Sequence, residues 1–302
     1  MKAARITPSF IRNLLPARRK NTGKGDYGRL LIVAGSKGMT GAAAIAAKAA
    51  LRAGAGLVTL ACPDSEQPVL AAALSDIMTL PVSSRAGAFS LKAADEILDW
   101  QKRRKYDLLL IGPGLSLKGQ VPAFVLKMVR KCALPAVIDA DALNALARAG
   151  ALELLKKGPP KIITPHEGEA ARLLGGAVKE RPMAACKLAE LSGSVAVLKG
   201  SKTLIAFGTR LMENPTGGPA LAKGGSGDAL AGLIAGFFAQ AGVKQGFTSK
   251  TAFESAALGV YLHGLCGDLA ALKLTESCVL ASELSDFLPA AIKAMKSAKR
   301  KM

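Results

Sequence analysis

The hydrophobic residues of this chain fall into short, nearly continuous runs, and alanine-rich stretches with helical spacing lie between them. The first run, Arg29 to Gly35, reads RLLIVAG and ends in glycine. Further runs of the same kind are predicted strands, at residues 57–61, 107–111, 136–139, 161–164, 195–198 and 203–207. Because apolar residues occupy consecutive rather than alternate positions in most of these runs, both faces of the strands are expected to be buried.

Helical stretches separate the predicted strands. An alanine-rich helix is predicted over Gly41 to Ala53, and longer helices are predicted at residues 228–242, 251–266 and 280–298. The run 203–207 is expected to form a hairpin with residues 211–212, turned at residues 208–209. Strands that alternate with helices predict an α/β fold with a mostly parallel sheet covered on both faces.

Composition and charge narrow the function classes. The length of 302 residues suits one large domain or two small ones, and a hydrophobic content of 50% excludes a disordered chain. The net charge of +19 is concentrated at the ends, with eight basic residues and one acidic residue in 1–30 and five basic residues in 293–301. Nucleic-acid binding is disfavoured because no zinc-finger, helix-turn-helix or RNP-type pattern is present. The charge then indicates an enzyme for anionic substrates with mobile basic ends, at about residues 1–20 and 293–302.

The sequence favours a cytoplasmic protein without a membrane span. Its five cysteines are widely spaced and form no CxxC pair, which favours reduced thiols over a disulfide framework or a zinc site. Residues 1–30 are charged and lack the long apolar segment of a secretory signal. The longest apolar stretch with helical spacing, Gly232 to Val243, is shorter than the ~20 residues that cross a bilayer and contains Gln240.

The strongest chemical signal is the segment Lys223–Gly232, KGGSGDALAG, which opens a predicted helix. Glycines let backbone N–H groups turn towards an anion, and the helix adds its positive N-terminal end. Asp228 lies in the first turn, where a carboxylate could deprotonate a hydroxyl during phosphoryl transfer. The same position suits a residue that only caps the helix, and spacing alone leaves both interpretations open. The segment matches neither a Walker A nor a Rossmann motif.

Two acidic segments follow other predicted strands. In Thr164–Glu169, TPHEGE, the side chains of His166 and Glu169 could face a substrate or a hydrated metal, although acidic residues there also suit helix capping. In Asp139–Asn144, DADALN, the two aspartates could organise Mg²⁺ through water, or Asp141 could cap a helix over 142–149. Both interpretations of each segment stay open.

Two glycine-containing turns complete the candidate chemistry. Gly112–Gly114 and Lys199–Thr203 each follow a predicted strand and would let a ligand approach the backbone closely. The second histidine, His263, lies in the apolar run 259–265 and is expected in the core. Because parallel strands bind ligands beyond their carboxyl ends, the position of these turns favours an enzyme.

Taken in chain order, these segments resemble the ADP-dependent NAD(P)H-hydrate dehydratases, a branch of the ribokinase-like superfamily. The resemblance covers about residues 20–290 and its motifs are specific as an ordered set. It rests on residues 24–28, 40–42, 49–58, 112–114, 139–144, 164–169, 199–200, 225–228 and 261–264. It implies a single three-layer α/β/α domain over residues 21–292 without a separate lid domain, between a basic segment 1–20 and a basic tail 293–302. Family members also assemble as homo-oligomers, and a tetramer is expected.

The resemblance implies a repair reaction. Family members act on NADH or NADPH that has gained water across the nicotinamide ring. They transfer phosphate from ADP to the 6-hydroxyl group and then eliminate phosphate, which restores the ring and leaves AMP. The implied co-substrate is ADP and the implied ion is Mg²⁺, with neither a membrane nor a nucleic acid as partner.

The resemblance also assigns roles to residues. Asp228 would be the catalytic base and would line the hydrate site together with Ala42, Gly114 and His166. Glu169 would hold Mg²⁺ through water. The nucleotide would be bound by Lys199, Gly200, Ser201, Lys202, Thr203 and Gly227.

The chain departs from the family pattern in two ways. Ser226 stands where members commonly have threonine, and the hydroxyl group is kept. Many bacterial members carry an N-terminal epimerase domain, whereas about 25 residues precede the first predicted strand here. The expected activity is therefore on the S epimer, with a separate epimerase supplying it. The alternative is an ATP-dependent kinase of a small alcohol or vitamin precursor, which His166 disfavours because many such kinases have asparagine there.

Overall fold

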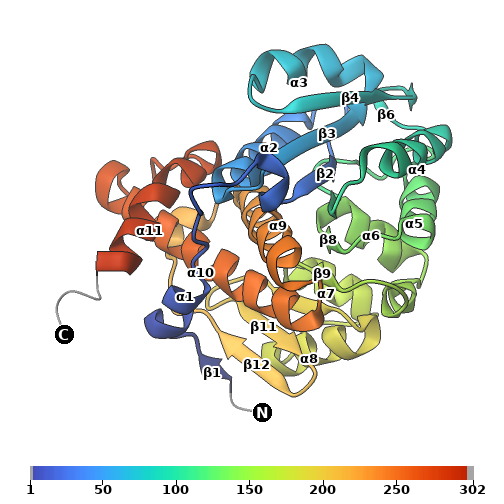
Figure 1. Ribbon diagram of the computed structural model, residues 1–302. Helices are drawn as coiled ribbons and strands as arrows, with labels where there is room; N and C mark the ends of the chain where they lie inside the picture. Colours follow the sequence, from blue (N-terminus) through green and yellow to red (C-terminus); the bar gives the residue numbers. More distant parts are fainter. Residues whose placement is uncertain (1–2, 298–302) are drawn as a thin grey trace.

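A ten-stranded sheet lies at the centre of the protein (Figure 1). The computed structural model describes residues 3–297 of the 302-residue chain. Its strands are β1 (Ala4–Arg5), β2 (Arg29–Val33), β3 (Leu57–Pro63), β4 (Met78–Val82), β5 (Ser84–Arg85), β6 (Ala88–Phe89), β7 (Leu108–Ile111), β8 (Ala136–Ile138), β9 (Lys161–Ile163), β10 (Val195–Leu198), β11 (Leu204–Phe207) and β12 (Arg210–Glu213). Strands β5 and β6 form a separate small hairpin.

The sheet is mostly parallel, as the sequence predicts. The strand order is β1-β12-β11-β10-β9-β8-β7-β2-β3-β4. Only the pairs β10–β11 and β11–β12 are antiparallel, and the second of these is the predicted hairpin. The order reverses direction between β2 and β7, which is the point where ligands bind in sheets of this kind.

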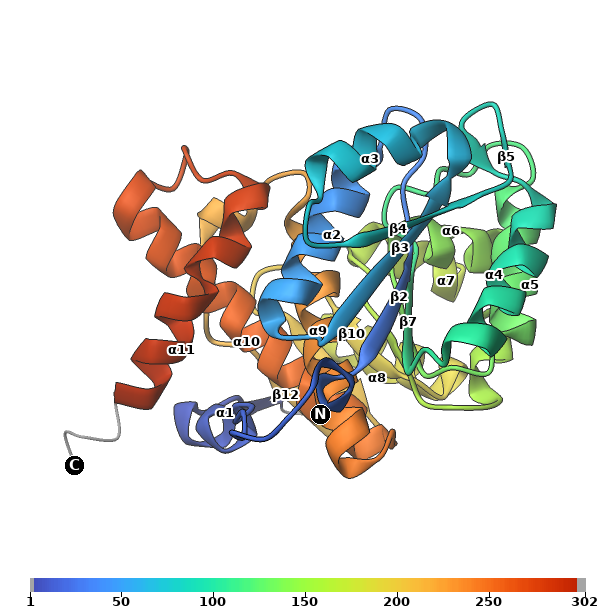
Figure 2. The same cartoon turned by 45° about the horizontal axis from the view of Figure 1, so that its top comes forward.

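Helices cover both faces of the sheet, which gives the predicted three layers (Figures 1 and 2). Helices α2, α9, α10 and α11 lie on one face, and helices α4 to α8 lie on the other. The helix bounds are α1 (Pro8–Leu14), α2 (Thr40–Ala53), α3 (Gln67–Ala73), α4 (Leu91–Arg104), α5 (Val121–Lys131), α6 (Ala140–Arg148), α7 (Glu167–Leu174), α8 (Arg181–Ser192), α9 (Ser226–Gln245), α10 (Ser249–Leu274) and α11 (Leu288–Ser297).

The two faces of the sheet have separate hydrophobic cores. In β2, Leu30 and Ile32 pack against the α2–α9–α10 side, whereas Leu31 and Val33 pack against the α4–α8 side. All four side chains are fully buried. This explains why the strands have continuous rather than alternating apolar runs: successive side chains point to opposite faces, and both faces are covered.

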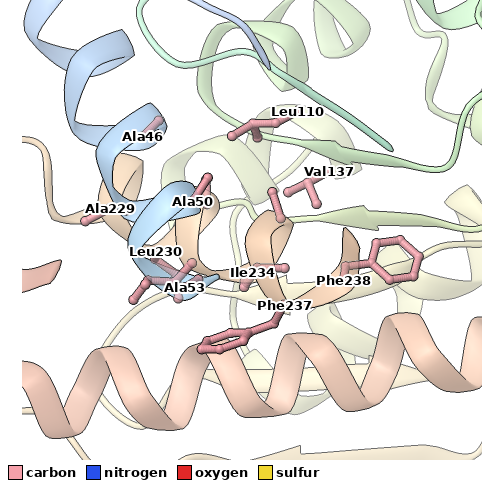
Figure 3. Packing of buried hydrophobic residues seen from close by; sticks show 14 of the residues in the cluster. Ala46, Ala50, Ala53, Leu110, Val137, Ala229, Leu230, Ile234, Phe237 and Phe238 are labelled. Carbon is pink, nitrogen blue, oxygen red and sulfur yellow. The ribbon is translucent and has the colours of Figure 1, made fainter. Parts of the chain in front are cut away.

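Helices α2 and α9 pack closely through small residues (Figure 3). Gly236 of α9 lies against the backbone of Ala50, and a Cβ atom at Gly236 would come within 2.7 Å of the Ala53 Cβ. Gly232 lies in the same way against Ala46 one turn earlier. The alanine-rich sequence of α2 and the glycines of α9 thus allow the two helix backbones to approach each other, and this contact positions the N-terminus of α9.

A methyl group at this contact is expected to destabilise the protein. Gly236→Ala would overlap the Ala50 carbonyl oxygen and should lower the free energy of unfolding by about 1–3 kcal/mol, the usual cost of overpacking. Gly41→Ala is the matched control, because a Cβ there meets no atom within 4 Å and the change adds a helix-favouring residue to α2. Urea unfolding of both variants tests this. Equal stability of Gly236→Ala and wild type would contradict the packing argument.

The chain ends differ from the expectation of mobile basic segments. Strand β1 adds a parallel edge to the sheet by pairing with β12, and Ile6 and Ile11 are almost fully buried. The expected mobility of the N-terminal segment is therefore wrong for residues 4–14, because their apolar side chains complete a core. Of the basic tail, residues 293–297 belong to α11, and residues 298–302 lie outside the described residues. The helix predicted at 280–298 is a 3₁₀ segment, Ala281–Phe287, followed by α11.

Helix α10 is longer and more apolar than the sequence pattern suggests. Its 26 residues make it long and apolar enough, by length and composition alone, to cross a membrane, and it is the one such helix within residues 3–297. Most of its apolar window, 72%, is buried inside the protein, where it packs against α9 and the sheet. The interpretation of residues 232–243 as the longest apolar helical stretch is therefore wrong. The five cysteines are free thiols, of which Cys62 and Cys266 are buried and Cys278 is exposed.

Candidate active site

The predicted site residues gather where five parallel strands end. The carboxyl ends of β2, β7, β8, β9 and β10 lie at one edge of the sheet, and their turns are linked by backbone hydrogen bonds. Gly35 N donates to Pro113 O at 2.9 Å, and Lys199 N donates to Pro165 O at 2.8 Å. Helix α9 begins beside this edge and packs against β2, β7 and β8. Sequence segments far apart in the chain thus meet in one place.

A buried ion pair lies at the centre of this edge. Lys199 Nζ donates to Asp139 Oδ1 at 2.7 Å and lies 3.8 Å from Glu169 Oε2. The Asp139 side chain is 1% exposed and the Lys199 side chain 16%. Burial opposes the charge of Lys199 most strongly, but Asp139 and Glu169 outweigh it and raise the pKa of the amine. Lys199 is therefore a fixed positive charge between two acidic side chains.

Backbone geometry brings Asp139 to this position. A Cβ atom at Gly112, which has a φ of +134°, would overlap the Asp139 carbonyl oxygen, so glycine is required there. The residue after Asp139, Ala140, has a φ of 48°, a left-handed conformation that is costly for a residue with a side chain. Asp139 forms the N-cap position of α6 but makes no side-chain capping bond, because its carboxylate is used by Lys199.

Asp141 does not cap the predicted helix over 142–149. Helix α6 begins at Ala140, so Asp141 is inside its first turn, and Asp141 Oδ2 accepts a hydrogen bond from Ser116 N at 2.8 Å. Asp139 also lies just outside the strand predicted over 136–139, because β8 ends at Ile138.

Asp228 lies in the first turn of α9, next to the ion pair. Gly225, not Asp228, occupies the N-cap position, and the Asp228 carboxylate makes no hydrogen bond within the described residues. The interpretation of Asp228 as a helix cap is therefore wrong. Burial, followed by the negative charge of Asp139, raises the pKa of Asp228 from 3.8 to about 7. A carboxyl group with this pKa can accept a proton near neutral pH.

The glycine-rich loop before Asp228 faces Lys199. A Cβ atom at Gly227 would be 3.3 Å from Lys199 Nζ, so the amine lies directly against this turn of the backbone. Below the loop, Ser226 Oγ lies 3.3 Å from His263 Nε2 of α10. His263 is 6% exposed, as expected for a core histidine, and burial lowers its pKa to about 4. The loop combines N–H groups at a helix N-terminus with one nearby cation, which is the arrangement that binds phosphate.

The segment after β9 places His166 and Glu169 at the start of α7. His166 Nδ1 accepts hydrogen bonds from Gly168 N and Glu169 N, and Glu169 Oε2 accepts one from His166 N at 2.8 Å. This reciprocal capping confirms the helix-capping interpretation of Glu169, yet Glu169 also faces Lys199. The His166 side chain is 53% exposed and remains accessible to a ligand. Glu167 instead pairs with Arg181 of α8 at 2.9 Å.

Two other predicted residues lie next to each other. A Cβ atom at Gly114 would be 3.0 Å from the Ala42 Cβ, so the turn after β7 contacts the first turn of α2. The loop Gly200–Thr203 follows Lys199, and its side-chain contacts are not with the ion pair: Thr203 Oγ1 donates to Gly200 O, and Lys202 lies 3.9 Å from Glu213. Of the residues predicted to bind the nucleotide, Gly227 lies against Lys199.

The carboxylates at this edge fit a Mg²⁺ ion held through water and nucleotide phosphates. Glu169 and Asp139 are both bonded to other protein groups, and no cluster of three or more His, Cys, Asp or Glu side chains suitable for a metal is found between residues 3 and 297. Mg²⁺ usually keeps several waters and uses one or two carboxylates together with substrate phosphates. Glu169 remains suited to such indirect binding.

Two functional contacts could not be found from the sequence pattern. Asp139 and Lys199 are 60 residues apart, and only the parallel order of β8, β9 and β10 brings them together. Arg181, at the start of α8, donates to the carbonyl oxygens of Leu198 and Ser201 on the predicted nucleotide loop. A basic residue in the first turn of a helix opposes the helix dipole, but Lys92 of α4 and Lys250 of α10 have the same position, so the sequence carries no specific signal for this contact.

The fold and this site define a ribokinase-like α/β/α protein with an anion-binding loop at a helix N-terminus. The structure is similar to that of an ADP/ATP-dependent NAD(P)H-hydrate dehydratase from Bacillus subtilis co-crystallised with ATP and Mg²⁺. The TM-score is 0.80 at 31% identity, and the match covers 98% of this chain and 99% of that one. A ribokinase-like superfamily protein from Enterococcus faecalis matches with a TM-score of 0.80 at 25% identity, over 97% and 96% of the two chains.

The NAD(P)H-hydrate dehydratase family matches residues 30–290, and the chain belongs to this family. The ADP-dependent (S)-NAD(P)H-hydrate dehydratase of Bacillus subtilis is 34% identical over 288 residues, which cover 94% of this chain and 95% of that protein. A bifunctional NAD(P)H-hydrate repair enzyme from Moorella thermoacetica is 43% identical over 290 residues. The chain spans about half the length of such bifunctional relatives, 53% in that case. The predicted fold class and the family resemblance are confirmed.

Proposed function

We propose that the protein is an ADP-dependent dehydratase that converts the S epimer of hydrated NADH or NADPH back to NADH or NADPH. The products would be the repaired cofactor, AMP and phosphate. The observation that carries this proposal is Asp228, a carboxyl group with a pKa of about 7 at the N-terminus of α9, beside the buried cation Lys199. Family membership supports the substrate class, because the relatives' names give this activity.

Asp228 would accept the proton of the 6-hydroxyl group as its oxygen attacks the terminal phosphorus of ADP. The bond between that phosphorus and the bridging oxygen of ADP breaks, and AMP leaves. The N–H groups of the loop 225–227 and Lys199 would stabilise the charge on the transferred phosphate. Elimination of this phosphate, with loss of a ring proton, restores the double bond. The departing phosphate would take up the ring proton, so the only base required of the protein is the one for the phosphoryl transfer. That base and the anion site both lie at the N-terminus of α9.

The two substrates would bind on either side of Asp228. Ala42, Gly114 and His166 would line the hydrate site, because Ala42 contacts Gly114 and His166 is accessible at the same sheet edge. The nucleotide would be held by the loop Lys199–Thr203 and by Gly227. Mg²⁺, when bound with ADP, would screen the phosphate charge, and Glu169 would hold it through water.

The wider setting of the reaction is also proposed. Hydrated nicotinamides form as two epimers, and a separate epimerase would convert the other epimer into the S form. The bifunctional repair enzymes among the relatives support this functional link. A homotetramer and a cytoplasmic location are further parts of the proposal. The dehydratase domain would be residues 21–292, and β1, α1 and the end of α11 pack onto it from the basic segments on either side.

The proposal is tested by the recovery of reduced-nicotinamide absorbance from chemically hydrated NADH. The purified protein is supplied with ADP and Mg²⁺, with ATP and Mg²⁺, or with no nucleotide, and the S epimer is followed by chromatography. Recovery that requires a nucleotide and consumes the S epimer is expected. A folded protein that gives no recovery under any of these conditions would refute the activity, and phosphorylation of small alcohols by ATP would then be tested.

A further inference from the structure

Arg181 joins two segments of the proposed active site. Its Nη1 donates to the carbonyl oxygen of Ser201, and its Nη2 lies 3.5 Å from that of Leu198, the last residue of β10. On the other side its Nε lies 2.9 Å from Glu167 Oε1, in the first turn of α7. The Nε–H is not aligned with this carboxylate and finds no hydrogen-bond partner within the described residues. The two carbonyl contacts are therefore the directed interactions of this guanidinium group.

The loop that Arg181 holds is strained. Lys202 has a φ of 54°, a left-handed conformation that costs a residue with a side chain about 1 kcal/mol or more and persists only where surrounding contacts impose it. Within the loop, Thr203 Oγ1 donates to Gly200 O at 3.0 Å. Apart from Arg181, no other side chain among residues 3–297 donates to a carbonyl group of the loop. The planar guanidinium can reach two carbonyl oxygens at once, whereas a lysine amine cannot do so with the same geometry.

The sequence is adapted to this contact at Gly200. A Cβ atom at Gly200 would be 2.7 Å from Arg181 Nη2, so any other residue would displace the guanidinium group. The Arg181 side chain is 26% exposed, compared with 55% for Glu167. The Glu167 carboxylate is thus largely solvated and is not aligned with the buried Nε–H of Arg181, so this ion pair contributes little energy and the carbonyl contacts carry the effect.

We propose that Arg181 is a positioning residue for the nucleotide: it fixes the shape of the loop 199–203 and thereby sets the affinity for ADP. This inference rests on the proposed function, in which that loop binds ADP. Loss of Arg181 leaves Asp228 and the glycine-rich loop intact, so the chemical step is retained once the nucleotide is bound. The expected signature is a change in KM for ADP without an equal change in kcat.

The test compares Arg181→Met with Arg181→Lys and with a control, Arg130→Met, at an exposed position in the last turn of α5. Because a hydrogen bond from a charged group contributes about 1.5–3 kcal/mol, Arg181→Met should raise the KM for ADP about tenfold or more. The value of kcat and the KM for the hydrate should change less than about threefold, and Arg181→Lys should be intermediate. Arg130→Met should behave as wild type.

Two measurements keep the inference separate from the proposed activity. Hydrogen exchange of the unliganded protein should be faster at residues 200–203 in Arg181→Met and unchanged in α9. Calorimetry with AMP should show weaker binding than wild type. Wild-type AMP affinity and loop exchange in Arg181→Met would overturn the inference while the proposed function stands. Absence of AMP and ADP binding to the wild-type protein would overturn both. If Arg181→Met fails to fold, the same comparisons are made with Arg181→Lys.

Discussion

Asp228→Asn is expected to remove most turnover while leaving the protein folded. A positioned general base contributes about 10²–10⁴-fold to rate, and asparagine has the shape of aspartate without its capacity to accept a proton. Turnover is measured as recovery of reduced-nicotinamide absorbance at saturating ADP and hydrate. Asp141→Asn is a matched control at the same sheet edge, because its carboxylate accepts a backbone N–H and acts on Asp228 only through its charge, which helps to raise the pKa of that base. Above pH 7 this control should keep most of its turnover. Near-normal turnover in Asp228→Asn would contradict the role of Asp228 as base.

The same residue predicts two pH dependences. With a pKa of about 7, Asp228 is the active, ionised base above that pH, so kcat/KM should fall about tenfold per pH unit well below it. The free energy of unfolding depends on pH in the opposite sense to kcat/KM. The pKa of Asp228 is raised from 3.8, so between about pH 4 and pH 7 the folded state holds a proton that the unfolded state has released. The free energy of unfolding therefore falls as the pH rises through this range, and the full loss is present above pH 7. Asp228→Asn should therefore be more stable than wild type at pH 8, with a smaller difference at pH 5. Urea unfolding at both values tests this sign.

Lys199→Met is expected to destabilise the protein strongly and to impair catalysis. It would leave Asp139 and Glu169 as buried acidic groups without their cation, and removal of one partner of a buried pair costs about 3–5 kcal/mol. The control is Lys202→Met in the same turn, whose side chain is 71% exposed and whose partner Glu213 is 3.9 Å away. That change should alter the free energy of unfolding by less than about 1 kcal/mol. Urea unfolding at pH 8 separates the two variants.

A second substitution tests whether unpaired buried charges cause the loss of stability in Lys199→Met. The double variant Asp139→Asn with Lys199→Met removes the stranded carboxylate, so it should recover part of the lost stability. The deficit of Lys199→Met should also shrink as the pH falls, because burial raises the pKa of Glu169 and its protonation removes an unpaired charge. The apparent ADP requirement should rise in every variant that lacks Lys199. If the single variant Lys199→Met is as stable as wild type, the stabilising role of the ion pair is contradicted.

Much of the fold could be predicted because its central strands are buried on both faces. Continuous runs such as RLLIV in β2 identify the strands of the parallel sheet, and the hairpin β11–β12 follows from its Gly208–Thr209 turn. The elements that the pattern missed lie at the edges. Strand β1 has two exposed residues and is defined by its pairing with β12, and β4 contains Pro81 and alternates exposed and buried residues. Edge strands lack the continuous apolar run that marks a central strand.

The candidate site was predictable in its parts but not in its connections. The glycine-rich loop and Asp228 stand out because special backbone geometry and a helix N-terminus leave a local sequence signature. The partner of Lys199 leaves no such signature, since Asp139 acts across two strands. The error at Asp141 has a related cause: α6 begins at Ala140, two residues before the predicted start, so Asp139 takes the N-cap position while its carboxylate binds Lys199.

The contact between Ser226 and His263 divides the site into a part that responds to acidity and a part that does not. The pKa of His263 is about 4, so His263 stays uncharged in the pH range in which Asp228 gains or loses its proton. The contact between His263 and Ser226 beneath the glycine-rich loop therefore keeps the same charge while the protonation state of Asp228 changes. Mild acidification would thus lower turnover by protonating Asp228, without changing the charge of the residues beneath the glycine-rich loop. Activity would return as soon as Asp228 lost its proton, without refolding or new synthesis of the protein.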